Sequence, residues 1–414
     1  MDVRGRYACG GWRLKILFNT QSLLPPRTGI GLYTQHLLEE MLRQPELEAV
    51  AGFLGGRIFR DSSLSLQLQQ GQTGSARSGE IASQSARRQD LGKTEIKKFL
   101  RGIPGAYALR QALREWRDGR GIAKMARESF IYHEPNYIPV RYAGPMVITV
   151  HDLSHLRYPQ FHPPERVAWL NAHLRSAIGR ADKIAVVSEF TRREIIDAFS
   201  VSEHKVCVTY NGATSDFHPR HQEQTRPTLQ YFGLRYNGFV LSVATLEPRK
   251  NLERLVEAYA ALPDALRRDY PLVLVGGSGW KNAALVSRVR DLEARGEAIR
   301  TGYLPRAQVL DLYAAAALFA YPSLYEGFGL PVLEAFASGV PVLTSNVSSL
   351  PEVSGGAALE VDPYSVDAIA EGMRALLDDA AMREHHAILG LERAKAFSWA
   401  RCAEQTLAVY RQLA

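Results

Sequence analysis

The chain has few cysteines and no long hydrophobic run. These two absences argue against a disulfide-stabilised fold and against a membrane-spanning helix. Its 414 residues include three cysteines, Cys9, Cys207 and Cys402, which lie far apart. This spacing fits neither a disulfide framework nor a thiolate metal site, and it suits a reducing compartment. No apolar run reaches the roughly 18 residues that a membrane helix needs, and residues 1–12 lack the apolar core of a signal peptide. We therefore expect a cytoplasmic protein with a disordered leader over 1–12.

Positive charge is concentrated in one stretch of the chain. The formal net charge is +7, and residues 87–127 hold twelve basic side chains against four acidic ones. Apolar residues such as Phe99, Leu100 and Trp116 are interspersed with them. A basic, partly amphipathic segment is typical of peripheral contact with an anionic membrane, and equally of a solvated helix face. No nucleic-acid-binding motif accompanies the charge, so nucleic acid is not an expected partner.

Two successive series of apolar strands and amphipathic helices run along the chain. In the first series we expect strands at 14–18, 48–54, 146–150, 183–187 and 205–209, with helices at 32–42, 164–178 and 191–199. In the second we expect strands at 239–243, 272–275, 318–321 and 340–343, with helices at 252–262 and 331–338. Such alternation predicts an α/β protein with two doubly wound parallel sheets.

The length of the chain also favours two domains. We expect an N-terminal domain over 13–217, interrupted at about 61–92 by a flexible insertion rich in Ser, Gln and Gly. A polar stretch, 217–228, is expected to link it to a C-terminal domain over 218–396. Residues 397–414 are expected to form a terminal helix that packs back on the first domain.

The most informative motif is Ser-Leu-Tyr-Glu-Gly-Phe-Gly-Leu-Pro-Val-Leu-Glu-Ala, residues 323–335. Pro331 suits the first position of a helix, so the amides of Gly329 and Leu330 would lie at a helix N-terminus and could donate to an anion.

Two carboxylates flank this turn, Glu326 in the loop and Glu334 in the expected first turn of the helix. An ionised carboxylate only accepts hydrogen bonds and can take two hydroxyl donors at once. The pair could therefore bind two sugars joined by a diphosphate. Taken alone, such a pair is more often a solvated loop residue and a helix-start glutamate favoured by the dipole.

A cationic pair follows the first strand of the second series, in Leu-Glu-Pro-Arg-Lys-Asn-Leu at 246–252. Arg249 offers a planar fork and Lys250 a point charge, and both suit a diphosphate and the charge that develops when it leaves. Isolated residues of this kind are more often ordinary surface cations.

Two further segments follow expected strands. Gly29 and Gly31 lie in a glycine-bearing turn that leads into the first helix, where the backbone can approach a ligand closely, although such turns often serve only packing. His151 ends the strand at 146–150, at the edge of the sheet where ligands bind, although it could simply satisfy a nearby carbonyl.

With these motifs in place, the chain resembles the retaining, GT-B-fold family 4 glycosyltransferases. Glu326 and Glu334 match the Glu-x7-Glu motif of that family, and residues 339–342 and 350–353 resemble its following segments. The resemblance extends over nearly the whole chain, apart from the leader and the insertion. It implies two Rossmann-like domains that face each other across a cleft, with the acceptor in the first and the nucleotide sugar in the second.

The resemblance also implies roles for particular residues. Those expected to be catalytic are His151, Arg249, Lys250 and Glu326. Those expected to bind the donor and its nucleotide are Gly29, Gly31, Gly302, Tyr303, Leu304, Phe328, Gly329, Leu330 and Glu334. No metal or cofactor is expected, because the cationic pair can hold the diphosphate.

The combined motifs look most like the mannosyltransferase branch that builds O-antigen and other surface polysaccharides. The expected reaction moves a hexose, mannose from GDP-mannose, onto a saccharide or lipid-linked saccharide acceptor. UDP- and dTDP-sugars remain open as donors. We expect front-face transfer, in which the leaving diphosphate assists deprotonation of the acceptor.

Other functions account for fewer of these residues. A sugar-nucleotide epimerase or a phosphorylase could share the architecture, but no pyridoxal-binding lysine context is recognisable. A catalytically silent scaffold in a polysaccharide-assembly complex would not need the glutamate pair together with the cationic pair. A membrane-binding module would explain only residues 87–127.

Overall fold

The computed structural model describes residues 14–24, 29–60, 63–65, 68, 118–277 and 283–414. The predicted leader, most of the predicted insertion and the basic stretch up to residue 117 lie outside this description. At the start of the insertion, Leu64 and Leu68 are both buried.

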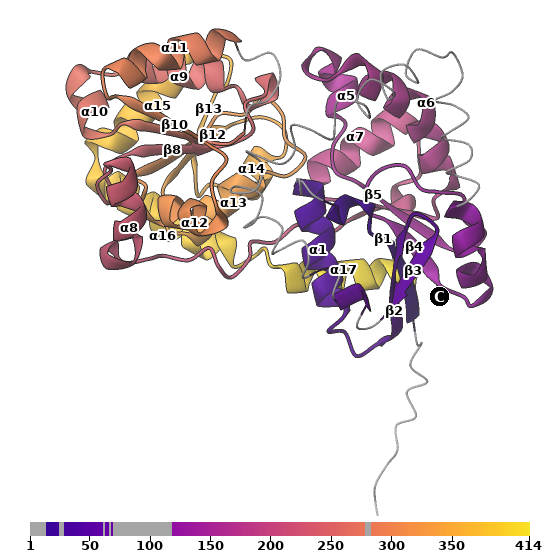
Figure 1. The fold of residues 1–414 in the computed structure, drawn as a ribbon. Coiled ribbons are helices and arrows are strands. Elements are labelled where there is room, and N and C mark those ends of the chain that lie inside the picture. The colour runs from indigo at the N-terminus through magenta and orange to yellow at the C-terminus, as the bar shows by residue number, and fades with distance from the viewer. Residues whose placement is uncertain (1–13, 25–28, 61–62, 66–67, 69–117, 278–282) are drawn as a thin grey trace, which may run out of the picture. The chain divides into compact units, whose positions relative to one another are not determined.

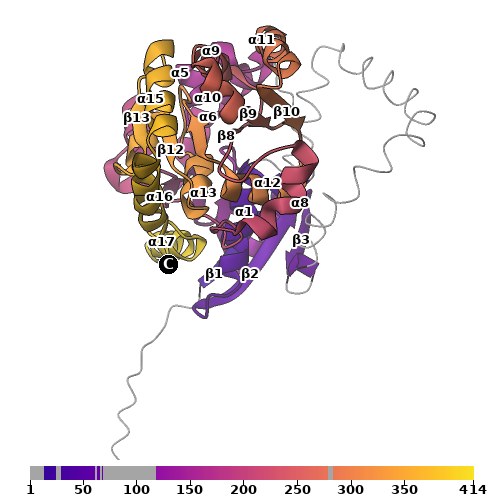
Figure 2. The same cartoon turned by 90° about the vertical axis from the view of Figure 1, so that its left-hand side faces the viewer.

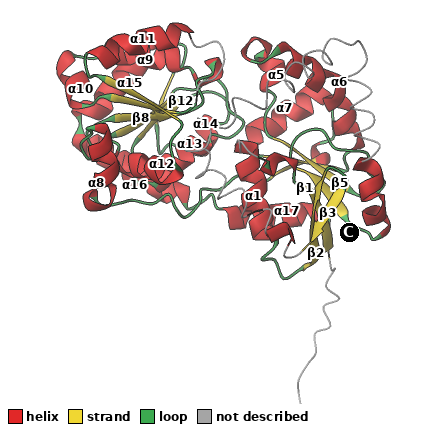
Figure 3. Ribbon diagram, in the orientation of Figure 1, coloured by secondary structure: helices red, strands yellow, loops and turns green. Residues whose placement is uncertain are grey.

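The chain forms two compact units. The first comprises the described residues up to Val150 together with Leu174–Ala185 and Ala403–Ala414, and the second comprises His151–His173 and Val186–Cys402. Helices and strands alternate through both units, as Figures 1 and 3 show.

The first sheet has seven strands in the order β3-β2-β1-β4-β5-β6-β7. β1 pairs in parallel with β2 and β4, β4 pairs in parallel with β5, and β3 is antiparallel to β2 at the edge. Its strands are β1 Leu14–Asn19, β2 Leu47–Leu54, β3 Arg57–Arg60, β4 Ile131–Glu134, β5 Met146–Val150, β6 Lys183–Val186 and β7 Val206–Val208. The main helices of these segments are α1 Gly29–Met41, α5 Ser154–Arg157, α6 Pro164–Arg180, α7 Glu189–Phe199 and α17 Trp399–Arg411.

The second sheet has six strands in the order β10-β9-β8-β11-β12-β13, and every neighbouring pair is parallel. Its strands are β8 Val240–Val243, β9 Leu272–Val275, β10 Ala298–Gly302, β11 Leu318–Tyr321, β12 Val342–Ser345 and β13 Leu359–Val361. Its helices are α8 Gln222–Phe232, α9 Leu252–Ala260, α10 Asp264–Asp269, α11 Ala283–Ala294, α12 Arg306–Ala315, α13 Leu330–Ala337, α14 Leu350–Ser354, α15 Val366–Asp378 and α16 Ala380–Ala394.

Helices cover both faces of the second sheet. Figures 1 and 2 show α9 and α11 on one side of the strands, with α8 and α12 on the other. One apolar core includes Leu255 and Val256 of α9, and the other includes Leu333 and Phe336 of α13. A sheet buried on both faces explains why β9 and β11 are continuous apolar runs rather than alternating ones. The predicted doubly wound parallel sheet is confirmed here.

The predicted linker at 217–228 is wrong in its second half, because residues 222–232 form helix α8. The backbone N–H of His221 donates to Oε1 of Gln224 at 2.8 Å, which helps to begin the helix. Thr225 and Thr228 lie on the buried face, and Thr228 Oγ1 donates to Asp311 on α12 at 2.5 Å. The buried face is thus partly polar, which is why composition alone suggested a linker.

Strand β4 was missed for a similar reason. Its sequence, Ile-Tyr-His-Glu, contains two polar residues, yet His133 and Glu134 are both buried. The ring of His133 hydrogen-bonds to the hydroxyl groups of Thr149 at 2.7 Å and Tyr410 at 2.5 Å. Polar side chains can be buried in a core strand when they form hydrogen bonds. A search for alternating apolar residues does not detect such a strand.

The two sheets lie on either side of position 217 in the sequence, because β7 ends at Val208 and β8 begins at Val240. Residues 403–414 of the C-terminal segment belong to the first compact unit. The domain bounds 13–217 and 218–396 stay a prediction. Within the described ranges, no helix combines the length and apolar character needed to cross a bilayer.

Candidate active site

The predicted cationic pair and Glu326 follow two neighbouring strands of the second sheet. The turn Pro248–Lys250 comes after β8, and the loop that carries Glu326 comes after β11. β8 and β11 pair with each other, and the strand order runs outward in opposite directions from them. Open α/β sheets bind ligands at the carboxyl ends of strands where the order reverses. Topology therefore brings together residues that lie far apart in the sequence.

Glu326 is the centre of this cluster and is only 6% exposed. Its Oε1 accepts hydrogen bonds from Lys250 at 2.7 Å, from the hydroxyl of Tyr321 at 2.9 Å and from Ser323 at 2.7 Å. Its Oε2 accepts one from Arg249 at 2.9 Å. Burial alone would raise the pKa of Glu326, but the positive charges of Arg249 and Lys250 lower it to about 2. The carboxylate is ionised at neutral pH.

The bonding of Glu326 limits what else it can accept. A carboxylate has about four acceptor positions, two on each oxygen. Oε1 already takes three donors from the protein, and Oε2 takes one. A single acceptor position, on Oε2, is therefore left for a ligand hydroxyl, rather than the pair that the sequence suggested.

Arg249 lies between several carboxylates. Its Nη1 donates to Tyr325 O at 2.8 Å and to Glu326, and its Nη2 donates to Oε1 of Glu247 at 3.0 Å. Burial would lower the pKa of Arg249, but Glu326, Asp152 and Glu247 raise it well above its usual value. The Nε–H is buried and has no hydrogen-bond partner among the described residues. A buried charge-bearing donor without an acceptor suits an anionic ligand.

Lys250 completes the pair. Its Nζ donates to the hydroxyl of Tyr321 at 2.7 Å and to Glu326, and it lies 5.4 Å from the centre of the Tyr321 ring. Burial and the neighbouring charge of Arg249 lower the pKa of Lys250. Because Glu326 and Glu247 compensate the two cations, neither charge is buried alone.

Asn251 joins the two loops that carry these side chains. It adopts a left-handed conformation, with φ of 59°, where asparagine is tolerated better than most residues. It is buried, and its Nδ2 donates to Pro322 O at 2.9 Å and to Pro363 O at 2.7 Å. The backbone is tied as well, because the Leu324 N–H donates to Arg249 O at 2.9 Å. These bonds fix the cationic pair against the β11 loop.

Two glycines in the motif allow close approach. A Cβ on Gly327 would lie 1.9 Å from the carbonyl oxygen of His151, and Gly329 has φ of 110°. His151 therefore lies against the Glu326 loop through its backbone. Its neighbour Asp152 faces Arg249: burial would raise the pKa of Asp152, but Arg249 and Ser154 lower it to about 2.

Helix α13 begins at Leu330, with Gly329 as its N-cap. The N–H groups of Gly329 and Leu330 make no hydrogen bond to another described residue. Pro331 is the second helical residue rather than the first, and Glu334 lies beyond the first turn, which corrects the expected positions. The shift follows from Leu330, which already has helical geometry. The free amides remain suited to an anion.

Glu334 is held differently from Glu326. Its Oε2 accepts a hydrogen bond from the hydroxyl of Tyr313 at 3.1 Å. Burial raises the pKa of Glu334 to about 7, although Tyr313 and the charge of Arg306 oppose that shift. The two glutamates of the motif thus have opposite pKa shifts, because only Glu326 contacts cations directly.

The remaining predicted residues lie in several places. Gly302 ends β10 with φ of 70°, Tyr303 is 76% exposed and Leu304 is buried. The ring of Phe328 packs in the core against Phe397, so only its backbone is open to a ligand role. Gly29 and Gly31 lie in the first turn of α1.

Gly29 and Gly31 belong to the first compact unit, whereas the residues around Glu326 belong to the second. Their proposed contact with the diphosphate stays a prediction. Within the described ranges, no three His, Cys, Asp or Glu side chains are grouped in a way that could hold a metal ion.

Sequence reasoning missed several partners of the site. Tyr321 and Ser323 donate to Glu326, Glu247 pairs with Arg249, and Tyr313 donates to Glu334. Tyr321 and Tyr313 looked like apolar core residues, and their hydroxyl groups gave no separate signal. Glu247 was within reach of prediction, because it stands two positions before Arg249 in the same turn.

Two family models match the chain. The model described as "Glycosyl transferases group 1" matches residues 236–389, and the model described as "Glycosyltransferase Family 4" matches residues 91–217. The chain is 38% identical over 410 residues to O-antigen chain mannosyltransferase B of Escherichia coli, covering 97% of this chain and 100% of that protein. It is also 35% identical over 240 residues to the serotype-specific mannosyltransferase WbdA of Escherichia coli, covering 56% of this chain and 29% of WbdA.

Solved structures share the fold. The Anabaena protein HepE in complex with UDP and glucose has a TM-score of 0.67 at 18% identity, over 97% of this chain and 100% of HepE. WaaG, a glycosyltransferase of lipopolysaccharide biosynthesis, has a TM-score of 0.62 at 15% identity, over 95% of this chain and 99% of WaaG. The predicted GT-B fold class is thereby confirmed. With a full-length relative at 38% identity, the chain belongs to the family 4, group 1 glycosyltransferases and is a glycosyltransferase.

Proposed function

We propose that the chain transfers a mannosyl residue from GDP-mannose to a hydroxyl group of a saccharide or lipid-linked saccharide. The product would belong to an O-antigen-like surface polysaccharide. Support for the sugar and the pathway comes from the two Escherichia coli relatives, whose names specify mannosyltransferases and, for one, the O-antigen chain.

The hydrogen bonding of Arg249 is the main support for the proposed donor site. Its buried Nε–H and one Nη2 hydrogen have no partner among the described residues. A guanidinium edge with two donors matches a phosphate oxygen pair. We assign this edge, together with Lys250 and the amides of Gly329 and Leu330, to the diphosphate of the donor. Gly302, Tyr303 and Leu304 would receive the base.

The two glutamates take different parts in this proposal. Glu326 holds Arg249 and Lys250 in place through its carboxylate and offers one acceptor position to a hydroxyl of the donor sugar. Glu334 would accept from the ribose hydroxyls. His151 would orient the anomeric carbon of the donor sugar.

We propose transfer with retention of anomeric configuration on one face of the sugar. The bond between the anomeric carbon and the diphosphate oxygen breaks while the bond to the acceptor oxygen forms. The acceptor proton passes to a diphosphate oxygen, and GDP leaves. Glu326 is unsuited to be a covalent nucleophile, because its carboxylate is already occupied by four protein donors. Arg249 and Lys250 would stabilise the charge that develops on the leaving group.

The experiment compares GDP, UDP, dTDP and ADP in thermal-shift measurements, and then assays transfer from GDP-mannose to a synthetic mannose-terminated glycolipid. We expect GDP to raise the melting temperature most, and NMR of the product to find an axial anomeric linkage. Greater stabilisation by UDP or dTDP would overturn the choice of donor. An inverted anomeric carbon would overturn the mechanism.

We also propose that the enzyme works in the cytoplasm and contacts an anionic membrane through residues 87–127, of which only 118–127 are described. Electrostatic attraction of this kind weakens with salt. Sedimentation with phosphatidylglycerol vesicles should therefore decrease between about 50 mM and 500 mM NaCl. Equal sedimentation with phosphatidylcholine vesicles would contradict the proposal.

A further inference from the structure

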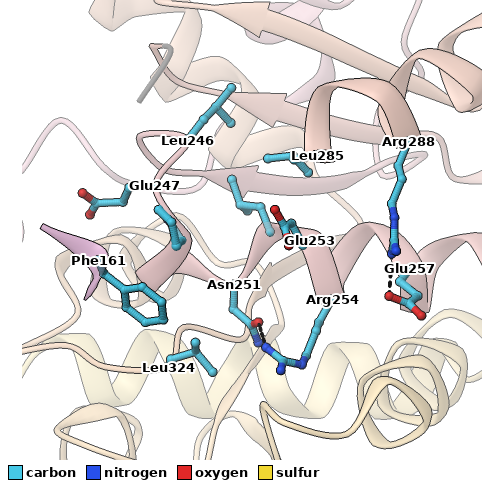
Figure 4. A pocket seen from close by; sticks show the side chains of 12 residues that line it. Phe161, Leu246, Glu247, Asn251, Glu253, Arg254, Glu257, Leu285, Arg288 and Leu324 are labelled. Carbon is cyan, nitrogen blue, oxygen red and sulfur yellow. Dashed lines mark hydrogen bonds and ion pairs between the residues drawn. The ribbon is translucent and has the colours of Figure 1, made fainter. Parts of the chain in front are cut away.

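A pocket of about 360 Å³ lies beside the cationic pair, within the second compact unit. Figure 4 shows it from close by. Its walls come from the 3-10 turn Pro159–Phe161, the segment from Leu246 to Glu257 and helix α11. The volume falls within the range of roughly 300–1,000 Å³ that small-molecule sites occupy.

Three side chains that line this pocket carry groups suited to recognising a sugar. Glu253, in the first turn of α9, makes no hydrogen bond or ion pair with a described residue. Arg254 donates from Nη1 to Oδ1 of Asn251 at 2.9 Å, and its guanidinium lies 5.8 Å from the centre of the Tyr364 ring; its Nε and Nη2 hydrogens have no hydrogen-bond acceptor among the described residues. Phe161 stacks in parallel on Tyr158, with ring centres 5.3 Å apart, so that one face of its ring is covered.

The far end of the pocket is closed by an ion pair. Arg288 of α11 donates to Glu257 of α9 at 2.5 Å, and Figure 4 shows this pair on the opposite side of the pocket from Phe161. Because these two charges compensate each other, that wall adds little attraction for a charged ligand.

The near end of the pocket adjoins the candidate active site. Glu247 lines the pocket and also accepts a hydrogen bond from Nη2 of Arg249 at 3.0 Å. Leu324 lines the pocket as well, and its backbone N–H donates to Arg249 O. A molecule held here would therefore lie one side chain away from the cation that we assign to the diphosphate.

We propose that this pocket binds a hexose unit of the acceptor saccharide. This inference rests on the proposed function and deepens it by naming where one acceptor hexose is held. Of the lining residues, Phe161 belongs to the range 13–217 that we expect to hold the acceptor, and the others belong to the range expected to hold the donor. The carboxylate of Glu253 would accept from vicinal hydroxyls, and the guanidinium of Arg254 would donate to hydroxyl oxygens. The aromatic ring of Phe161 would pack against the C–H groups of the sugar.

The charge of the pocket favours a neutral polyol over the nucleotide. Glu247 and Glu253 both line it, and they would repel a diphosphate placed on this side of Arg249. An acceptor sugar carries no such charge, and its hydroxyl groups can use both the carboxylates and the guanidinium.

The test measures binding of methyl α-D-mannopyranoside to the full chain by saturation-transfer NMR, with no nucleotide present. The variants are Glu253→Gln, Phe161→Leu and Phe161→Ala, and the control is Glu371→Gln, which makes the same change on an exposed part of α15. GDP affinity of each variant is measured separately by calorimetry. Circular dichroism checks that each variant is folded.

We expect binding of the glycoside to weaken about tenfold in Glu253→Gln, because a hydrogen bond to a charged group is lost. Both Phe161 variants should weaken it, and Glu371→Gln should not. GDP affinity should stay unchanged in all of them. Unchanged glycoside binding in Glu253→Gln and Phe161→Leu would overturn the proposal, as would an equal loss of GDP affinity. If GDP fails to bind the wild-type protein, the proposed donor is wrong. The glycoside measurement still decides whether the pocket binds an acceptor sugar.

Discussion

Arg249 and Glu326 form a buried ion pair although 77 positions separate them, with Nη1 of the arginine 2.9 Å from Oε2 of the glutamate. One follows β8 and the other follows β11, which are adjacent strands where the sheet order reverses. Buried side chains fix the two loops that carry this pair: Asn251 donates a hydrogen bond to Pro322 O, and Ser323 donates one to Arg249 O. The cation is therefore placed before a ligand arrives, which reduces the cost of ordering it on binding.

The shape of the Arg249 side chain should matter as much as its charge. Arg249→Lys keeps the positive charge but loses the two-donor edge that we assign to the diphosphate. We expect GDP affinity to fall about tenfold in Arg249→Lys, and further in Arg249→Ala. Calorimetric titration with GDP measures this, and Arg374→Lys on the exposed face of α15 is the control. Equal GDP affinity in wild type and Arg249→Lys would show that the two-donor edge of Arg249 does not contribute to GDP binding.

Glu326→Gln tests the role of the central carboxylate. The variant keeps the shape but removes the charge that orients Arg249 and Lys250, so turnover should drop about 100-fold. GDP affinity should fall much less than turnover, because both positive charges remain. Steady-state transfer from GDP-mannose gives kcat, and Glu371→Gln is the matched control. Near-normal transfer by Glu326→Gln would contradict the site.

The pKa of Glu334, about 7, should make donor binding depend on pH. If the ionised carboxylate accepts from the ribose hydroxyls, the KM for GDP-mannose should rise as pH falls from 8 to 6. Glu334→Gln should bind the donor more weakly at pH 8 and lose this dependence. A wild-type KM that stays constant from pH 6 to 8 would argue against ribose contact by Glu334.

The same shift has a consequence for stability. The pKa of Glu334 is raised on folding from 4.5, so its protonated form favours the folded state. That contribution is present below pH 4.5 and is lost as pH rises through about 7. Glu334→Gln should therefore melt higher than wild type at pH 8, by on the order of 2 °C, and by less at pH 5. Calorimetric melting at both values measures the difference, and a lower melting temperature at pH 8 would contradict the shift.

Asn251 should contribute to stability through its side-chain hydrogen bonds. Asn251→Ala loses bonds to two carbonyl groups and keeps a strained backbone. Asn237→Ala is a matched control, because Asn237 has a similar φ of 52° but is exposed and its side chain makes no hydrogen bond to another described residue. We expect Asn251→Ala to lower the free energy of unfolding by about 2–3 kcal/mol more than Asn237→Ala. Urea unfolding measures both, and equal losses would show that backbone strain alone matters.

Much of this site was predictable because it depends on strand ends. Arg249, Lys250 and Glu326 each follow an apolar strand, and parallel topology brings such ends to one edge of the sheet. Sequence also predicted the helix start that leaves the amides of Gly329 and Leu330 free.

The side-chain bonding could not be read from the sequence. Nothing in the position of Tyr321 or Tyr313 distinguishes a core ring from one whose hydroxyl serves a glutamate. The opposite pKa shifts of Glu326 and Glu334 likewise depend on which carboxylate contacts the cations, and spacing along the chain does not specify that. The buried threonines of α8 were misread for the same reason.

A crystal structure of the enzyme with GDP would show whether the diphosphate lies at Arg249. We expect a diphosphate oxygen within about 3 Å of Nε of Arg249, with Lys250 and the amides of Gly329 and Leu330 around the same group. A diphosphate bound away from Arg249, with the Arg249 Nε–H still lacking an acceptor, would show that this arginine does not hold the donor.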